Sequence, residues 1–464
     1  MNANEVLAGI WRQAGLPEAA LPLARLTGAD PVLPSSFAVG AAAQSTIAAA
    51  ALAACELGHL RGAARQQVGV DMLHAALECT GWFSLDGRAP AIWEAFSGLY
   101  RCADGWVRIH ANFAHHRDGA LRLMKLDPAT ATREDAEVAM ATWRARDFED
   151  AAAAQGLVAT AMRRFDEWDA TPQGQAIAAQ PLFTIERIGD AAPVALPPLR
   201  EDQRPLAGLR VLDLTRILAG PVGGRALAAY GADVMLVNSP GLPNIEAIAD
   251  TSRGKLSAHA DLRSGEGRAA LQRLLADAHV FVQGYRPDGI AELGFGPAEV
   301  ARQRPGIVYV SLTAYGTQGP WARRRGFDSL VQTAMGFNHA EGEAAGDGQP
   351  KPLPMQILDE ATGYLIAFGA AAALWRQQQE GGSWHVQVSL AQTGHWLRSL
   401  GRVPNGLATQ RPPLAPFIET TASGFGELAA LRHSAQLSRT PAAWTRPSMP
   451  PGSHPPVWPG VAVE

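Results

Sequence analysis

The sequence predicts an α/β protein in which a Rossmann-like, doubly wound parallel sheet forms a large domain and a smaller α+β domain accompanies it. After residue 205, short apolar strand patterns alternate with helical segments, and this β-α-β repetition is typical of a parallel sheet. Around the Ala-Asp-Gly turn at residues 103–105, two alternating strands indicate a hairpin outside that repetition. The proline-rich segment 193–205 separates the two patterns and marks a linker.

The composition describes an ordinary globular chain. Its 464 residues suffice for roughly three domains, and 47% hydrophobic with 18% charged residues excludes overall disorder. A formal charge of −4 argues against a general nucleic-acid binder, and three cysteines are too few for a disulfide framework. The first residues lack the pattern of a signal peptide, and the longest apolar stretch, residues 38–57, is mostly alanine. We therefore expect a cytoplasmic protein that binds neither nucleic acid nor membrane.

The first 195 residues are predicted to contain two units. Helices over residues 1–16 and 41–60 and a strand over 67–72 lie in a segment, 1–95, that we expect to complete the large domain. The small domain is expected over 96–195. It begins with the hairpin and continues through charged helical segments, including 133–151, which are most simply a solvated face.

The large domain is predicted over residues 205–400. Apolar strands are expected at 209–214, 232–237, 279–283, 306–312 and 384–390. Helices are expected at 221–228, within 258–278 and at 358–376. The remaining residues, 401–464, are punctuated by prolines and are predicted to wrap over another surface as a tail.

Several common active-site signatures are missing. The turn Ala219–Gly224 lacks the glycine spacing of a dinucleotide site, and Asn238 replaces the acid expected after the second strand. This turn is equally well read as a tight strand-to-helix connection or as an open backbone that a ligand approaches. Neither a phosphate-binding Gly-x-x-x-x-Gly-Lys motif nor a Gly-x-Ser-x-Gly elbow occurs. His110, His115 and His116 lack the acids and spacing of a metal site and are more typical of surface histidines.

Asp359 is the most pointed candidate for chemistry. It is placed where an alanine-rich helix should begin, so free N–H groups and the helix dipole are expected to lower its pKa. An ionised carboxylate there is either a nucleophile toward an activated acyl group or simply a helix cap. Just upstream, residues 341–349 are predicted to form a flexible loop that either covers a reactive intermediate or is ordinary surface. Residues 253–255 and 323–325 are basic clusters that either pair with phosphates or are solvated.

Together these residues resemble the class III CoA-transferases (CaiB/BaiF type), the family of formyl-CoA transferase, carnitine CoA-transferase and α-methylacyl-CoA racemase. Five blocks in the family's order carry the resemblance, at residues 205–241, 252–262, 282–295, 306–336 and 358–374. The small domain precedes the large one here, which is unusual for the family. A helix and strand at 41–72 are also similar to those at 361–390. The chain therefore looks like a permuted or partly duplicated member.

The resemblance implies a transferase in which Asp359, within Asp359-x-x-Thr362-Gly363, is the nucleophile toward an acyl-CoA thioester. It implies coenzyme A as a substrate, no permanently bound cofactor and no metal. The implied coenzyme A contacts are Leu218, Ala219, Thr251, Ser252, Arg253, Gly254, Gly284, Tyr285, Arg286, Arg325, Phe327 and Asp328.

The implied reaction moves CoA from an acyl-CoA to a small carboxylic acid through aspartyl anhydride and aspartyl-CoA thioester intermediates. Leu218, Asn238, Ser239 and Glu292 depart from the family pattern, and their lost polar contacts would weaken CoA binding. Two alternatives remain open. One is an acyl-CoA racemase or isomerase, for which His339 is the convenient histidine, and the other is a non-catalytic CoA-binding homologue. The family also implies a homodimer, either interlocked or relieved of interlocking by the altered domain order.

Overall fold

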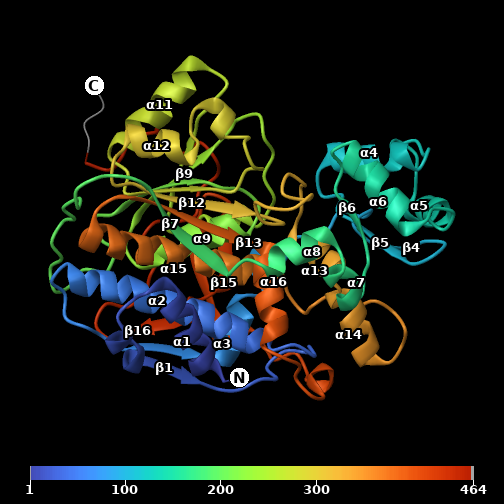
Figure 1. The fold of residues 1–464 in the computed structure, drawn as a ribbon, viewed down its shortest axis with the longest axis horizontal. Coiled ribbons are helices and arrows are strands. Elements are labelled where there is room, and N and C mark those ends of the chain that lie inside the picture. The colour runs from blue at the N-terminus through green and yellow to red at the C-terminus, as the bar shows by residue number, and fades with distance from the viewer. Residues whose placement is uncertain (1, 461–464) are drawn as a thin grey trace.

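Seven strands form the large sheet, in the order β10-β9-β8-β11-β12-β13-β7 (Figure 1). The computed structural model describes residues 2–460. The strands from β10 to β13 run parallel, and β7 pairs antiparallel with β13 at one edge. The bounds are β7 Phe183–Gly189, β8 Arg210–Leu214, β9 Asp233–Asn238, β10 Leu256–His259, β11 Val280–Gln283, β12 Val308–Thr313 and β13 Ser383–Ser389.

Helices cover both faces of this sheet because its strands are apolar on both sides. Along β11, Val280 and Val282 pack into one hydrophobic core and Phe281 packs into another. The first core is shared with α9 (Ala219–Ala229) and α15 (Ile357–Glu380). The second is shared with α11 (Gly265–Ala276) and α12 (Pro297–Gln303), which lie on the opposite side of the sheet in Figure 1. The predicted doubly wound sheet is confirmed.

The connections place a topological switch point between β8 and β11. From β8 the chain proceeds through β9 to β10 at one edge, returns to β11 beside β8, and then continues through β12 to β13. The loops after β8 and β11 therefore leave the same edge of the sheet and diverge. Such a crevice is where open α/β sheets bind their ligands.

The N-terminal segment packs on the large domain through α2 (Val39–Leu60), which lies along α15. Both helices are long and apolar enough to cross a membrane, but their most apolar windows are 100% and 94% buried within the protein. α1 (Ala3–Ala14) and α3 (Met72–Glu78) flank α2. The strand that follows α2 does not join the large sheet. Instead β2 (Val68–Asp71) pairs with β1 (Ala24–Thr27) and β16 (Ala435–Leu437).

The small domain has its own sheet and core. The predicted hairpin, β4 (Gly98–Arg101) and β5 (Trp106–Ile109), is joined by β6 (Ala159–Ala161). Three helices enclose a core that is separate from the other two: α4 Ala114–Leu123, α5 Arg133–Met140 and α6 Ala145–Ala154. Two short helices, α7 Phe165–Asp169 and α8 Pro172–Ala178, then lead into β7. The range 96–195 thus includes a strand of the large sheet.

The C-terminal segment crosses the N-terminal one. β14 (Ile418–Ser423) and β15 (Gly426–Leu431) form a hairpin to which β3 (Phe83–Leu85) adds a strand, and α16 (Leu390–Ser399) leads into this region. Further on, Trp444 and Trp458 pack against the two cores of the large domain. The tail therefore wraps over the large domain and also contributes strands.

The prediction of a flexible loop at residues 341–349 is wrong for the first half of that range. α14 (Phe337–Ala345), which follows α13 (Asp328–Met335), continues through residue 345. Glu341 is 1% exposed, and its carboxylate accepts hydrogen bonds from Ser35 and Ser36. These anchoring groups lie 300 residues away in the sequence, so the local pattern could not reveal them.

Candidate active site

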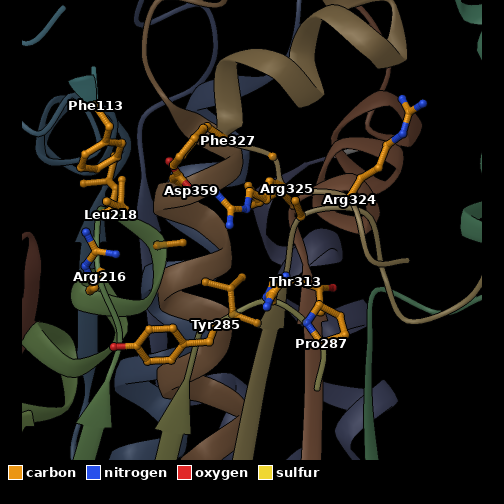
Figure 2. A pocket seen from close by; sticks show the side chains of 18 of the residues that line it. Phe113, Arg216, Leu218, Tyr285, Pro287, Thr313, Arg324, Arg325, Phe327 and Asp359 are labelled. Atoms are coloured by element: carbon orange, nitrogen blue, oxygen red, sulfur yellow. The ribbon is translucent and has the colours of Figure 1, made fainter. Parts of the chain in front are cut away.

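Asp359 lies in the first turn of α15, at the junction of two cavities. Its side chain borders a cavity of about 350 Å³ with basic walls and another of about 600 Å³ with mostly apolar walls. Ile217, Leu218 and Phe327 line both cavities and so surround the junction. Figure 2 shows the Asp359 side chain with Leu218 on one side and Arg325 on the other. A molecule that fills both cavities must pass this carboxylate.

The smaller cavity is basic because three loops at the carboxyl edge of the sheet contribute arginines. The loops follow β8, β11 and β12, and their lining arginines are Arg216, Arg286, Arg324 and Arg325. Asp359 is the one carboxylate among the lining residues. Guanidinium groups bind phosphate oxygens in pairs, so these walls are complementary to a phosphorylated ligand.

The larger cavity is assembled from segments distant in the sequence. The N-terminal region contributes Leu33, Trp82 and Trp93, and the segments around Met355 and Leu414 complete the wall. Polar groups are few, and those on the small domain's strand and the residues after it are Arg108, His110 and Asn112. A largely apolar chamber next to a carboxylate suits an organic group and excludes water.

The pKa of Asp359 is shifted in the direction opposite to the one predicted. Burial first, and then repulsion by Asp328 and Glu360, raise its pKa well above its ordinary range. Among residues 2–460, no N–H group donates a hydrogen bond to the Asp359 carboxylate, so the expected stabilisation by the helix end is missing. Instead the backbone N–H of Asp359 donates to Asp328 Oδ2 at 2.9 Å.

The two neighbouring carboxyls differ in their surroundings. Asp328, in the first turn of α13, is fully buried and accepts from Gln332 at 2.5 Å, and burial raises its pKa to about 7. Burial also raises the pKa of Glu360, although Arg225 lies 3.9 Å away and opposes the shift. Three carboxyls of raised pKa therefore lie together at the start of α15.

The turn between the cavities is strained. Ile217 has φ +79°, a left-handed conformation that crowds a β-branched side chain and costs on the order of 1–3 kcal/mol. Its neighbour Leu218 is the N-cap of α9, and its carbonyl accepts from the N–H of Val222. Strain of this kind concentrates at binding and catalytic sites, and here the strained residue borders both cavities.

Most residues that the resemblance assigns to coenzyme A gather in the basic cavity. Its lining includes Leu218, Ala219, Gly284, Tyr285, Arg286, Arg325 and Phe327. Asp328 lies behind the junction, fully buried next to Asp359. Thr251, Ser252, Arg253 and Gly254 line neither cavity.

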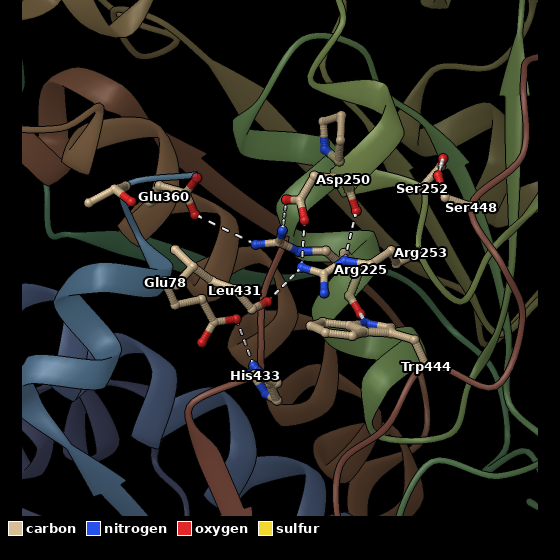
Figure 3. A network of polar contacts seen from close by, with 12 residues as sticks. Glu78, Arg225, Asp250, Ser252, Arg253, Glu360, Leu431, His433, Trp444 and Ser448 are labelled. Atoms are coloured by element: carbon tan, nitrogen blue, oxygen red, sulfur yellow. Dashed lines mark hydrogen bonds and ion pairs between the residues drawn. The ribbon is translucent and has the colours of Figure 1, made fainter. Parts of the chain in front are cut away.

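Ser252 and Arg253 contact the C-terminal segment (Figure 3), and the N–H of Gly254 donates to the carbonyl of Arg446. The guanidinium of Arg253 pairs with Asp250 at 2.5 Å and lies 3.8 Å from the ring centroid of Trp444. Ser252 Oγ contacts Ser448 Oγ at 2.5 Å. Lys255 pairs with a buried aspartate at 2.8 Å. The basic cluster at 253–255 is thus satisfied inside the protein, which corrects the prediction that it pairs with phosphate or is solvated.

Four cavity residues were not assigned a role at the site from the sequence. Arg216, His115 and His116 line the basic cavity, while His110 lines the apolar one. Arg324 and Arg325, from the predicted basic cluster at 323–325, also line the basic cavity. Arg216 had a usable signal, because it lies two residues after the predicted strand 209–214, at the carboxyl edge. The histidines had none, because they belong to the small domain and reach the site only through tertiary packing.

The other positions singled out in the sequence lie outside both cavities. Asn238, Ser239 and Glu292, which depart from the family pattern, do not line them. His339, the histidine considered for a racemase, lies outside them as well and is 3.3 Å from Glu343.

Comparison with known proteins places the site within a family. Residues 206–412 match the model of CoA-transferase family III. An acyl-CoA transferase of Gibberella moniliformis is 30% identical over 377 residues, which cover 72% of this chain and 66% of that protein. A succinate–glutarate CoA-transferase of Agrobacterium fabrum is 34% identical over 251 residues, or 48% of this chain and 62% of that protein.

A third relative, the succinyl-CoA:glutarate CoA-transferase of Mus musculus, is 34% identical over 186 residues, which cover 37% of this chain and 42% of that protein. The matches therefore span from 42% to 66% of the length of these three relatives. The matched family segment holds the strands of the switch point, the strained turn and Asp359. Through residues 206–412, the chain is therefore similar in sequence to CoA-transferase family III.

Proposed function

We propose that this protein is a CoA-transferase that moves coenzyme A from an acyl-CoA donor to a carboxylic acid acceptor, with Asp359 as the covalent nucleophile. The observation that carries the proposal is the position of this carboxylate where a basic cavity meets an apolar one. In this proposal the arginines bind the phosphates of the CoA moiety, the apolar chamber takes the acyl group, and the thioester lies at Asp359.

The proposed cycle conserves atoms and charge at each step. A carboxylate oxygen of Asp359 attacks the thioester carbonyl, the C–S bond breaks, and an anhydride and CoA thiolate form. The thiolate attacks the aspartyl carbonyl, which releases the donor acid and leaves an aspartyl-CoA thioester. The acceptor carboxylate then displaces the thiolate to form a second anhydride. Attack of the thiolate on the acceptor's carbonyl forms the new acyl-CoA and frees Asp359.

The protein contributes three things to this cycle. Desolvation makes an ionised Asp359 more nucleophilic, because water no longer stabilises its charge. The walls of the apolar chamber keep water from hydrolysing the anhydrides. The arginines hold the CoA moiety while its thiolate leaves and returns, which keeps the second attack effectively intramolecular.

Trapping of the covalent intermediate tests this proposal. Incubation with an acyl-CoA and hydroxylamine should give a hydroxamate at residue 359, located by fragment ions in mass spectrometry. The Asp359→Asn variant, of nearly the same shape, is the control and should remain unlabelled at that position. Transfer of CoA without labelling of Asp359 would count against the covalent role.

His110 supports a second candidate function, an acyl-CoA racemase. It lines the apolar cavity together with Asp359, and its ring stacks on Phe327 at 3.9 Å. Burial, aided by nearby positive charge, lowers the pKa of His110 to about 3, so its imidazole is neutral but a weak base. A racemase would need the bound substrate to raise that pKa before the ring could take the α-proton. Exchange of the α-proton of a branched acyl-CoA with deuterated water, without labelling of Asp359, would favour this candidate over transfer.

The oligomeric state is part of the proposal as well. We infer that one chain suffices for one site, since residues of its own small domain (Phe113, His116) and large domain (Arg325, Asp359) line the same cavity. A homodimer would then carry two independent sites. Specific activity that falls on dilution in step with dissociation, followed by light scattering, would contradict this inference.

A further inference from the structure

Arg108 is a buried guanidinium without an anionic partner. It lies in β5 of the small domain and is 8% exposed. Within residues 2–460, no acceptor takes a hydrogen bond from its guanidinium, no carboxylate lies within ion-pair distance, and its Nε is fully enclosed without a partner. Burial lowers the pKa of Arg108 only to about 10, so the group is charged at neutral pH.

Each of the other buried arginines has at least one acceptor, although Arg163 Nε and Arg225 Nη2 also lack a hydrogen-bond partner among residues 2–460. Arg61 donates to three different backbone carbonyls, and Arg163 pairs with a buried glutamate. Arg225 and Arg253 both pair with one buried aspartate. Arg108 alone among the buried arginines of the described chain is left unpaired, although an unpaired buried charge is expensive.

A packing role explains only part of this arrangement. The guanidinium lies 4.9 Å from the ring centroid of Trp93, and such a cation–π contact is favourable. Stacking of this kind engages the face of the guanidinium and leaves its in-plane N–H groups without acceptors. Asp328 attracts Arg108, but its carboxylate already accepts from Asp359 and Gln332.

The unpaired group borders the chamber proposed for the acyl group. Arg108 lines the cavity of about 600 Å³ that also contains Asp359. Arg108 comes from the small domain and Asp359 from α15 of the large domain, and both line this one chamber. An anion on Arg108 would therefore share the chamber with the reacting carbonyl.

We propose that Arg108 binds the distal carboxylate of a dicarboxylic acyl group whose other end is the thioester attacked by Asp359. The substrates would then be short dicarboxylic acids and their mono-CoA thioesters. The proposal rests on the proposed function and assigns it a substrate class. Guanidinium and carboxylate pair through two parallel hydrogen bonds, and such a pair would supply the partner that Arg108 lacks.

Matched acids of equal chain length test the assignment. Transfer is measured with succinyl-CoA against butyryl-CoA as donor, and with glutarate against valerate as acceptor. The wild-type protein should prefer the dicarboxylic member of each pair. Arg108→Met should lower kcat/KM for that member by about 10–100-fold and change the monocarboxylic member by less than about threefold. Arg108→Lys keeps the charge without the paired geometry, and its kcat/KM for the dicarboxylic member should lie between those of the wild-type protein and Arg108→Met.

Arg411 provides the matched control, because it lines the same cavity but is exposed. Arg411→Met should leave the ratio of dicarboxylic to monocarboxylic substrate unchanged. The assignment is overturned if Arg411→Met abolishes the preference while Arg108→Met does not. It is also overturned if Arg108→Met slows both members alike, or if the wild-type protein shows no preference.

A binding measurement separates this proposal from the proposed function. In thermal denaturation, glutarate should stabilise the wild-type protein more than valerate does, and Arg108→Met should abolish the difference. Labelling of Asp359 by butyryl-CoA and hydroxylamine should persist in Arg108→Met. If no acyl-CoA labels Asp359 but glutarate binding still depends on Arg108, the covalent mechanism fails while the carboxylate site stands. The ligand-free variant should melt no lower than the wild-type protein, because removal of the unpaired buried charge offsets the lost contact with Trp93.

Discussion

Asparagine in place of Asp328 should make the protein less stable than wild type near pH 4 and more stable near pH 8. Burial raises the pKa of this carboxyl from 3.8 to about 7. Because the folded-state pKa is raised, the stability that the protonated carboxyl contributes is present below its unfolded pKa and is lost as the pH rises through about 7. Asparagine stays neutral throughout and avoids that loss.

The magnitude follows from the size of the shift. About three pKa units at ~1.4 kcal/mol each give at most ~4 kcal/mol between acidic and alkaline conditions. The carboxyl accepts from the Asp359 N–H and from Gln332, and asparagine can satisfy one of these with its oxygen, which loses ~1 kcal/mol. The variant should therefore be ~1 kcal/mol less stable at about pH 4 and up to ~3 kcal/mol more stable at about pH 8.

Urea unfolding followed by tryptophan fluorescence at the two pH values measures this crossover. Asp190 supplies the matched control, because its side chain is 98% exposed. Asp190→Asn should follow the wild-type protein to within about 0.5 kcal/mol at both pH values. A difference between Asp328→Asn and wild type that does not change with pH would refute the claim that burial makes the ionised form of Asp328 costly.

Three further outcomes follow from the same structure. If Asp359 is the nucleophile, it must be ionised, and because its pKa is raised, kcat/KM should fall with decreasing pH at a higher pH than an ordinary aspartate would give. Asp328→Asn removes a repelling charge and should move that fall to lower pH, and an unmoved profile would contradict the coupling. Arg325→Met should weaken CoA binding about tenfold in calorimetry, and the loss should be smaller at high salt. The control Arg323→Met, at a residue outside the cavity whose side chain is 81% exposed, should change the affinity less than about twofold. Equal effects of the two variants would argue against the basic cavity as the CoA site. Glu78→Ala should lower the free energy of unfolding, measured in urea, by about 3–5 kcal/mol, because the Glu78 carboxylate accepts hydrogen bonds from three buried groups. A variant as stable as wild type would show that these groups find other partners.

The sequence predicted those parts of the fold whose causes are local. The strand at 209–214 is apolar because it is covered on both faces, and this signal does not depend on its neighbours. The strand at residues 256–259 was missed because its pattern, Leu-Ser-Ala-His, is short and only half apolar. It pairs with β9 at the sheet edge, where burial demands less of the side chains.

The candidate site could be predicted only along one segment. Asp359 and the loops after β8, β11 and β12 lie within residues 206–412, so a resemblance over that range reaches them. The pKa of Asp359 could not be predicted, because its sign depends on Asp328, 31 residues upstream, and on the density of packing around both. Arg108 is likewise unremarkable in sequence, since its burial and its missing partner are tertiary facts.

The distribution of unsatisfied charge separates structural polar groups from functional ones in this protein. Figure 3 shows how thoroughly buried charge is compensated away from the cavities, where Arg225, Asp250 and Arg253 hold the C-terminal segment in place. Around the apolar chamber two groups lack such compensation. The carboxyl of Asp359 is crowded by other acidic groups, and the positively charged guanidinium of Arg108 has no partner among the described residues. In the proposed reaction each would be relieved by one part of the same ligand, because acylation would remove the charge of Asp359 and a distal carboxylate would neutralise Arg108. Both groups destabilise the ligand-free protein, and under this proposal the bound substrate would remove both costs at once.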